Sequence, residues 1–204
     1  MEGKPRRDPA SFEAKRRAIL KAATRVFAQK GFTGTRVGDI AREAGIAYGL
    51  IYHYFDNKDA ILHCLFAESW GLSIKVVEDI DAQGGTLRGK LVGIVDFFLQ
   101  AWRIEPDLVE VVMREVLRSP KFLEADNLDH FKRIFALLER ILRQHEGELR
   151  PDADPRLTAL LFLGALEILL TGFVARELLG EDPEAIASSG EALVDTFLRG
   201  VARA

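Results

Sequence analysis

The chain has 204 residues, of which 48% are apolar and 29% are charged, the make-up of a globular protein rather than of a disordered or fibrous one. Its single cysteine excludes an intramolecular disulfide and a cysteine-rich zinc site. The net charge of −3 divides unevenly: residues 1–58 hold 12 Lys and Arg against 6 Asp and Glu, whereas residues 59–204 hold 16 against 25, so that the basic head suits binding of a polyanion.

We expect no secretion signal, because the first 17 residues are polar and basic and contain no apolar stretch. The most apolar segment, residues 157–174, is interrupted by Thr158, Glu167 and Thr171, which favours a buried helix over a membrane span. A cytoplasmic protein without membrane contact is therefore expected.

Helical periodicity recurs along the whole chain, while alternating strand-like runs are almost absent. An all-α fold of about nine helices is therefore predicted. In chain order, the helices are expected at about 11–30, 36–43 and 47–54, from 58 to a break at 83–86, from 87 to about 102, from 106 to about 118, from 120 to about 142, at about 155–179 and from 183 to about 201.

Capping residues and glycines predict where these helices begin and end. Gly31 should end the first helix, Thr35 should N-cap the second and Asn57 should N-cap the fourth. Because Gly38 would then occupy position N3 of the second helix, no reciprocal capping box is expected there.

The segment 35–58 is the most informative in the chain, because it predicts two short helices joined by a tight turn at Gly45. Ile51 and Phe55, four residues apart, would give the second of these helices a buried edge. Its other side chains would then face outward, which is how a helix-turn-helix places a helix in the major groove of DNA.

Small and polar residues of this segment are the expected DNA contacts. Ala47 and Gly49 would let the backbone approach the bases, while Tyr48 and His53 could bond base edges or phosphates. Thr35, Arg36, Tyr52, Tyr54 and Lys58 suit phosphate oxygens. The alternative for Tyr52 and Tyr54 is that their rings fill the core. The expected DNA-binding residues are Thr35, Arg36, Ala47, Tyr48, Gly49, Tyr52, His53, Tyr54 and Lys58.

Taken together, these residues resemble the DNA-binding head of TetR-family transcriptional regulators. The likeness covers about residues 12–62, and Tyr48 departs from it, standing where the family often has a small or basic residue. The resemblance implies a homodimer on a palindromic operator of double-stranded DNA, and a ligand cavity whose occupancy changes the spacing of the two heads. It rests on Gly31-Phe32, Thr35, Ile40-Ala41, Ala44-Gly45 and the run from Tyr52 to Leu62.

We therefore expect residues 1–58 to be the DNA-binding domain and residues 59–204 to be a helical bundle for ligand binding and dimerisation. The helix at 155–179 is apolar nearly all round and must be covered on every side. The family resemblance places the dimer contact at the last two helices, and Gly164 would permit close approach. The alternative is that this helix is the central core helix of the monomer.

The body carries many large apolar side chains, which predicts either a packed core or the lining of an apolar ligand site. Within the family, the chain looks most similar to the fatty-acid-degradation repressors, which respond to long-chain acyl-CoA. No cofactor or metal is expected; Arg114 would serve an acidic headgroup. The expected ligand-binding residues are Phe66, Trp70, Phe98, Trp102, Met113, Arg114, Phe131 and Phe135.

Other functions remain open at this point. A TetR-type regulator of an efflux or other catabolic operon would respond to a different hydrophobic ligand, and a helical adaptor would bind protein without DNA. An enzyme is not expected, because the histidines lack metal-binding spacing and Cys64 has no assignable histidine partner. Glu167 is expected to face a polar partner or the dimer seam.

Overall fold

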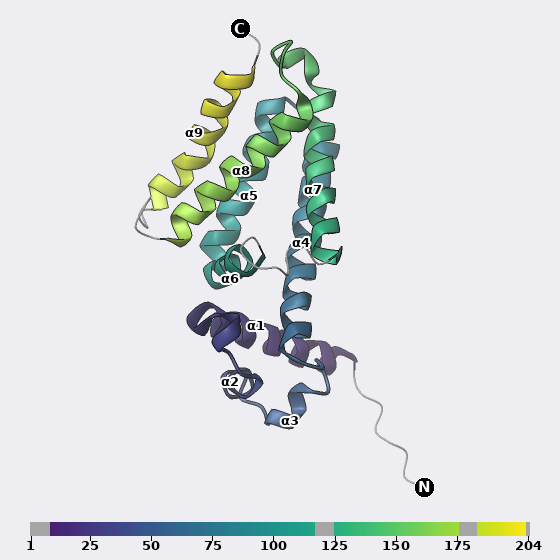
Figure 1. The fold of residues 1–204 in the computed structure, drawn as a ribbon, viewed down its shortest axis with the longest axis vertical. Coiled ribbons are helices and arrows are strands. Elements are labelled where there is room, and N and C mark those ends of the chain that lie inside the picture. Colours follow the sequence, from purple (N-terminus) through teal and green to yellow (C-terminus); the bar gives the residue numbers. More distant parts are fainter. Residues whose placement is uncertain (1–8, 117–124, 176–182, 203–204) are drawn as a thin grey trace. The chain divides into compact units, whose positions relative to one another are not determined.

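The structure is a computed structural model that describes residues 9–116, 125–175 and 183–202 (Figure 1). Within these ranges the chain forms nine α-helices and one short 3-10 helix, η2, which confirms the all-α prediction. The β contact seen there is an isolated bridge between Leu149 and Ala202. The helices are α1 (Pro9–Gly34), α2 (Val37–Glu43), α3 (Tyr48–Ile51), α4 (Lys58–Ala82), α5 (Leu87–Ile104), α6 (Pro106–Val116), α7 (Ala125–Gln144), η2 (Glu146–Glu148), α8 (Pro155–Val174) and α9 (Pro183–Val201).

The chain divides into two compact units, residues 1–68 and residues 69–204, which we call the head and the body. The head holds α1 to α3 and the first part of α4, and the body holds the remainder. Residues 59–68, which were expected in the second domain, group with the head by their contacts. The expected helix ends near 118 and 179 lie outside the described residues.

The head is built from α1 packed on α2 and α2 packed on α3. Gly31 has a φ of 69°, a left-handed conformation open to glycine, and the regular helix breaks there as predicted. Ile51 and Phe55 are buried, so α3 and the turn after it have the expected inner edge. The apolar core of the head consists of Ile19, Leu20, Ala22, Ala23, Val26, Phe27, Phe32, Ile40, Ala41, Ile51, Phe55, Ile61, Leu62, Leu65 and Phe66.

The second helix begins one residue later than predicted. Arg36, not Thr35, is the N-cap of α2, so that Asp39 takes the N3 position expected for Gly38. Asp39 Oδ2 accepts a hydrogen bond from the Arg36 backbone N–H at 3.1 Å, and a capping contact exists where none was expected. The Thr35 hydroxyl is engaged elsewhere, since it donates to the Gly31 carbonyl at 2.8 Å.

The body is a helical bundle in which α5 packs along α9 and α7 along α8. The predicted break before α5 is confirmed, because Gly84 and Gly85 have φ values of 73° and 98°. Thr86 then caps α5 by accepting a backbone N–H at 3.1 Å, and Asp154 caps α8 at 2.7 Å. Buried side chains of all these helices form one continuous core, which includes Leu91, Ile94, Val95, Leu138, Ile141, Leu142, Ala159, Phe162, Phe173 and Val194.

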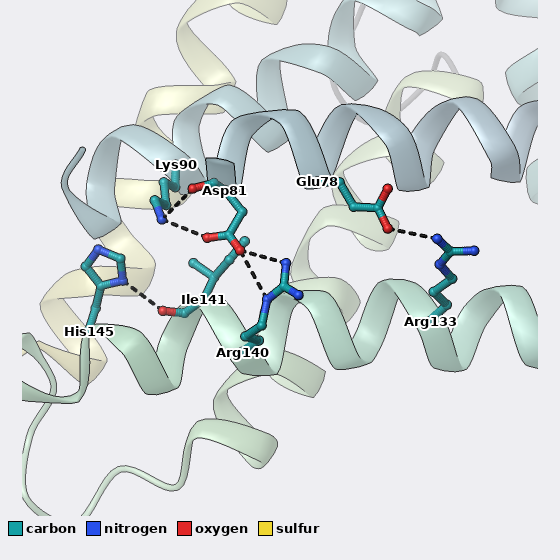
Figure 2. A network of polar contacts seen from close by, with 7 residues as sticks. All are labelled: Glu78, Asp81, Lys90, Arg133, Arg140, Ile141 and His145. Carbon is teal, nitrogen blue, oxygen red and sulfur yellow. Dashed lines mark hydrogen bonds and ion pairs between the residues drawn. The ribbon is translucent and has the colours of Figure 1, made fainter. Parts of the chain in front are cut away.

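Charged side chains tie the end of α4 to α5 and α7 (Figure 2). The buried Asp81 carboxylate accepts hydrogen bonds from Lys90 Nζ and from Arg140 Nη2, each at 2.8 Å. One turn earlier, Glu78 accepts from Arg133 Nη2 at 2.8 Å. Burial raises the pKa of Asp81, but the hydrogen bonds and charges of Lys90 and Arg140 outweigh that effect and leave the pKa below its ordinary value.

Helix α8 has one apolar face that the body does not cover. Leu157, Leu161 and Ile168 recur at helical spacing and are 55%, 54% and 70% exposed. By length and composition alone, α4 and α8 would both suffice to cross a membrane, a test that core helices of soluble proteins also meet. The described residues of the chain therefore leave one apolar face of α8 exposed.

Candidate functional site

The recognition segment, residues 35–58, contains α2, a turn and α3. Gly45 has a φ of 66°, and the Ile46 N–H donates to the Ala41 carbonyl at 3.0 Å, which closes the turn as predicted. α3 proper is shorter than the expected 47–54, because after Ile51 the backbone tightens into bonds between residues three apart, such as His53 N to Leu50 O at 3.1 Å.

Six of the nine expected DNA-contacting residues are exposed in the head. Tyr48 and Tyr52 are 56% and 45% exposed, so their hydroxyl ends are open to solvent or to a partner. Ala47 and Gly49 leave the backbone uncovered beside them. The exposed members of the predicted set are Arg36, Ala47, Tyr48, Gly49, Tyr52 and His53.

Tyr48 and Tyr52 act as a pair. Their hydroxyl oxygens are 2.8 Å apart, and their rings meet edge to face with centroids 5.4 Å apart. The hydrogen bond with Tyr48 raises the pKa of Tyr52, and desolvation and the neighbouring phenol act in the same direction. Because one hydroxyl must donate to the other, the pair retains one free O–H for a phosphate or base acceptor.

Thr35 and Lys58 use their polar groups inside the head. Thr35 is 2% exposed, and its hydroxyl is bonded to the Gly31 carbonyl. Lys58 Nζ donates to the Phe32 carbonyl at 2.9 Å and to the Thr35 carbonyl at 3.1 Å, and it lies 4.4 Å from the centroid of the Phe32 ring. Lys58 thus holds the α1–α2 connection against α4, and its contact with DNA stays a prediction.

Tyr54 is partly buried, with its ring stacked on Phe12 of α1 at a centroid distance of 4.6 Å. From the sequence, Tyr54 was either a DNA contact or a core aromatic, and its partly buried, stacked ring is compatible with both. Phe12 was missed there, since a single phenylalanine near the start of a helix gives no signal of its partner.

The body contains an apolar cavity of about 260 Å³. It is bounded by α4, α5, α6, α7 and α8, all within residues 69–204. Fifteen of its nineteen wall residues are apolar or glycine, so that the cavity suits an apolar ligand. The wall consists of Ser69, Trp70, Leu72, Ser73, Phe97, Phe98, Ala101, Leu108, Val109, Val112, Met113, Phe131, Ile134, Leu160, Leu163, Gly164, Leu166, Glu167 and Leu170.

Half of the predicted ligand-binding residues line this cavity, namely Trp70, Phe98, Met113 and Phe131. The other four lie elsewhere. Phe66 is buried in the head, Trp102 belongs to the core of the body and Phe135 packs against that core. Arg114 is not among the residues of the cavity wall, and it forms an ion pair with Glu110 of its own helix at 2.9 Å.

Cys64 lies in the head beside Arg16 and Glu68. Burial, followed by the charge of Glu68, raises the pKa of the Cys64 thiol to about 11. A thiol with that pKa is protonated at neutral pH and is a poor nucleophile. Among the described residues, no group of three or more His, Cys, Asp or Glu side chains is arranged to hold a metal ion.

Two family models match the chain. The model of bacterial regulatory proteins of the tetR family matches residues 19–65, and the model of the tetracyclin repressor-like C-terminal domain matches residues 86–199. The first corresponds to the helices that form the recognition segment, and the second to most of the body.

Individual relatives point in the same direction. The chain is 29% identical over 161 residues to the fatty acid metabolism regulator protein of Bacillus subtilis, covering 78% of this chain and 83% of the relative. It is 27% identical over 175 residues to an HTH-type transcriptional repressor of Mycobacterium tuberculosis, covering 86% and 88%. The crystal structure of the transcriptional regulator FadR from Bacillus subtilis in complex with stearoyl-CoA superposes with a TM-score of 0.78 at 26% identity, over 90% of this chain and 98% of that one.

Proposed function

Because the chain belongs to the tetR family of bacterial regulatory proteins, we propose that it represses fatty-acid-degradation genes and is released from its operator by a long-chain acyl-CoA. Its general role is that of a ligand-responsive transcriptional repressor of the TetR type. The observation that carries the finer proposal is the apolar cavity in the body, in a chain similar to a regulator whose structure contains stearoyl-CoA.

The exposed surface of the head supports the proposed contact with DNA. Tyr48, Tyr52 and His53 present hydrogen-bonding groups next to the small Ala47 and Gly49, which suits close approach to base edges. The basic excess of the head adds attraction to phosphate that does not depend on sequence. We therefore assign base reading to the exposed residues of the segment and a scaffold role to Lys58 and Thr35.

The uncovered face of α8 supports the proposed homodimer. Regulators of this family bind DNA and effectors typically as dimers. Leu157, Leu161 and Ile168 form an exposed apolar stripe, and Gly164 lies beside it without a side chain to hold a second helix away. A two-fold pairing of α8 and α9 with their counterparts would cover this stripe and present two recognition segments to successive major grooves.

The cavity volume indicates how an acyl-CoA would bind. A volume of about 260 Å³ lies slightly below the range of roughly 300–1,000 Å³ that is common for small-molecule sites. Such a space takes part of a long acyl chain but not the coenzyme. The chain would therefore insert among the aromatic side chains while the nucleotide stays outside, and full insertion would widen the cavity. That widening would favour a conformation with weaker affinity for the operator.

The proposal is tested by mobility-shift titration of the purified protein on the promoter beside its own gene. Binding should prefer that fragment over random DNA and should weaken steeply with salt. Stearoyl-CoA should then release the DNA, whereas coenzyme A alone should not. Absence of sequence preference would remove the operator proposal, and release by neither compound would remove the acyl-CoA proposal. We expect the protein in the cytoplasm, where the operator is.

A cavity-filling variant ties the response to this site. Ala101 lines the cavity from α5, so Ala101→Phe should fill it and give a repressor that binds DNA but ignores stearoyl-CoA. Gln100→Phe is the matched control, because Gln100 is the exposed neighbour on the same helix. Equal responses of both variants would place the effector elsewhere.

A further inference from the structure

The cavity wall is apolar except for four side chains, Ser69, Trp70, Ser73 and Glu167. The Ser73 hydroxyl is already bonded, since it donates to the Ser69 carbonyl of its own helix at 2.9 Å. Trp70 and Glu167 come from different helices, α4 and α8, and differ in chemistry. Ser69 also has an interaction within the protein, so Trp70 and Glu167 are the wall residues whose polar side-chain groups have no partner among the described residues.

Trp70 contributes a hydrogen-bond donor without an acceptor. Its Nε1 is buried and has no partner among the residues that the structure describes. An indole N–H can only donate, so that a carbonyl or ether oxygen of a ligand is the kind of group that would satisfy it. A buried donor left unpaired is unfavourable, and a ligand that supplies an acceptor removes that penalty.

Glu167 contributes a carboxylate. It is the one charged residue among the described wall residues, and no hydrogen bond or ion pair to it is found within the described ranges. Glu167 is half-buried and lies one helical turn after Leu163 and Gly164, which are wall residues as well. A carboxylate there accepts hydrogen bonds from N–H or O–H groups and repels another carboxylate.

We propose that the group held between Trp70 and Glu167 is the uncharged junction of an acyl thioester rather than the carboxylate of a free fatty acid. The thioester carbonyl accepts a hydrogen bond, as the Trp70 N–H requires. The first amide N–H of the pantetheine arm donates one, as Glu167 requires. A fatty acid carboxylate has no donor for Glu167 and faces a like charge. This assignment rests on the proposed acyl-CoA response and specifies how the site selects it.

Calorimetric titration with three probes of one chain length tests the assignment: stearoyl-CoA, stearoyl-pantetheine and stearate. The wild-type protein should bind both thioesters more tightly than stearate. Glu167→Gln keeps the shape and an acceptor oxygen but removes the charge, and it should improve stearate binding about tenfold with little change for stearoyl-pantetheine. Glu148→Gln, an exposed change of the same kind in the body, should change neither.

The donor is tested separately. Trp70→Phe keeps an aromatic ring and removes the N–H, so stearoyl-pantetheine should bind about five- to tenfold more weakly. Trp102→Phe is the control, because Trp102 lies in the core and not in the cavity wall. Circular dichroism checks that each variant is folded. Glu167→Leu provides a second charge-free variant if the glutamine change disturbs α8.

The outcomes separate this inference from the proposed function. If stearoyl-CoA neither binds nor releases DNA, the proposed function fails. If stearoyl-CoA binds and releases DNA, but Glu167→Gln, Glu167→Leu and Glu148→Gln all keep the wild-type preference for thioester over stearate, the assignment of Glu167 is wrong while the function stands. An unchanged affinity in Trp70→Phe would likewise remove the proposed donor.

Discussion

The head and the body differ in how they use polar side chains at the sites proposed to contact DNA and ligand. In the head, Lys58 is bonded to two carbonyl oxygens and Tyr48 to Tyr52, so that the recognition segment is fixed before DNA arrives. In the cavity of the body, Trp70 and Glu167 have no partner among the described residues. The tyrosine pair of the head keeps one O–H for DNA, whereas Trp70 and Glu167 of the body are proposed to gain partners when a ligand binds.

This difference suits two kinds of partner. The phosphate backbone of DNA has a regular geometry, and a preorganised surface binds it without the entropic cost of ordering side chains. An effector changes the protein only if it binds one conformation more tightly than another. The buried, unpaired N–H of Trp70 can provide such a difference, because a ligand with an acceptor would satisfy it. Four predictions examine this contrast.

The largest effect is expected in the body. Lys90→Met removes a cation that is 6% exposed from Asp81, which is 8% exposed, and leaves Arg140 as its remaining partner. Loss of one member of a buried pair should lower the free energy of unfolding of the body by about 3 kcal/mol. Urea unfolding followed by circular dichroism, with hydrogen exchange of residues 69–204, measures this change.

The control for that variant lies on the same helix as Asp81. Lys75→Met breaks an exposed pair with Asp79 and should change the free energy of unfolding by less than about 0.5 kcal/mol. An equal decrease in the free energy of unfolding in the two variants would show that the buried Lys90–Asp81 pair stabilises the body no more than the exposed pair does.

Lys58→Met should destabilise the head by about 2 kcal/mol, because the Phe32 and Thr35 carbonyls lose a charged donor. Hydrogen exchange of residues 19–65 should accelerate while exchange in the body stays unchanged. Weakened DNA binding without faster exchange would instead make Lys58 a direct phosphate contact, as the sequence suggested.

Tyr48→Phe and Tyr52→Phe should each reduce operator affinity about five- to tenfold without altering the fold, since each breaks the hydroxyl pair. If the pair acts as a unit, the double variant should bind no more weakly than the poorer single one. Fully additive losses, measured by mobility shift, would mean that the two hydroxyls contact DNA independently.

The smallest effect is expected with acid. The pKa of Asp81 is below its ordinary value in the folded protein, so the stability it contributes is present above about pH 4 and is lost as the pH falls through the folded pKa. The urea concentration at the unfolding midpoint of the body should therefore decrease when the pH is lowered below about 4. In Asp81→Asn the midpoint should be lower at neutral pH but flatter with acid, and an unaltered pH profile would contradict the role of Asp81.

Features set by local chemistry were predictable from the sequence. The positive φ values at Gly31, Gly45 and Gly84 stand at the predicted breaks, because glycine is the residue that adopts them without strain. The start of α2 was predicted one residue too early, because the Thr35 hydroxyl donates back to the Gly31 carbonyl instead of capping α2, and Arg36 takes the N-cap position.

The cavity was predictable only in part, for a geometric reason. Phe98 and Trp102 are four residues apart on α5, yet Phe98 lines the cavity and Trp102 joins the core. Which side of a helix faces a void depends on how neighbouring helices cross it, and periodicity does not contain that information. Glu167 was expected to face a polar partner or the dimer seam, and it lies on the cavity wall.

The aromatic residues described above are also distributed by type. All three tyrosines of the chain, Tyr48, Tyr52 and Tyr54, belong to the recognition segment, and both tryptophans, Trp70 and Trp102, belong to the body. Indole emission therefore reports on the unit that contains the cavity, without a tryptophan contribution from the head. Effector binding in the body can therefore be followed by tryptophan fluorescence of the unlabelled protein.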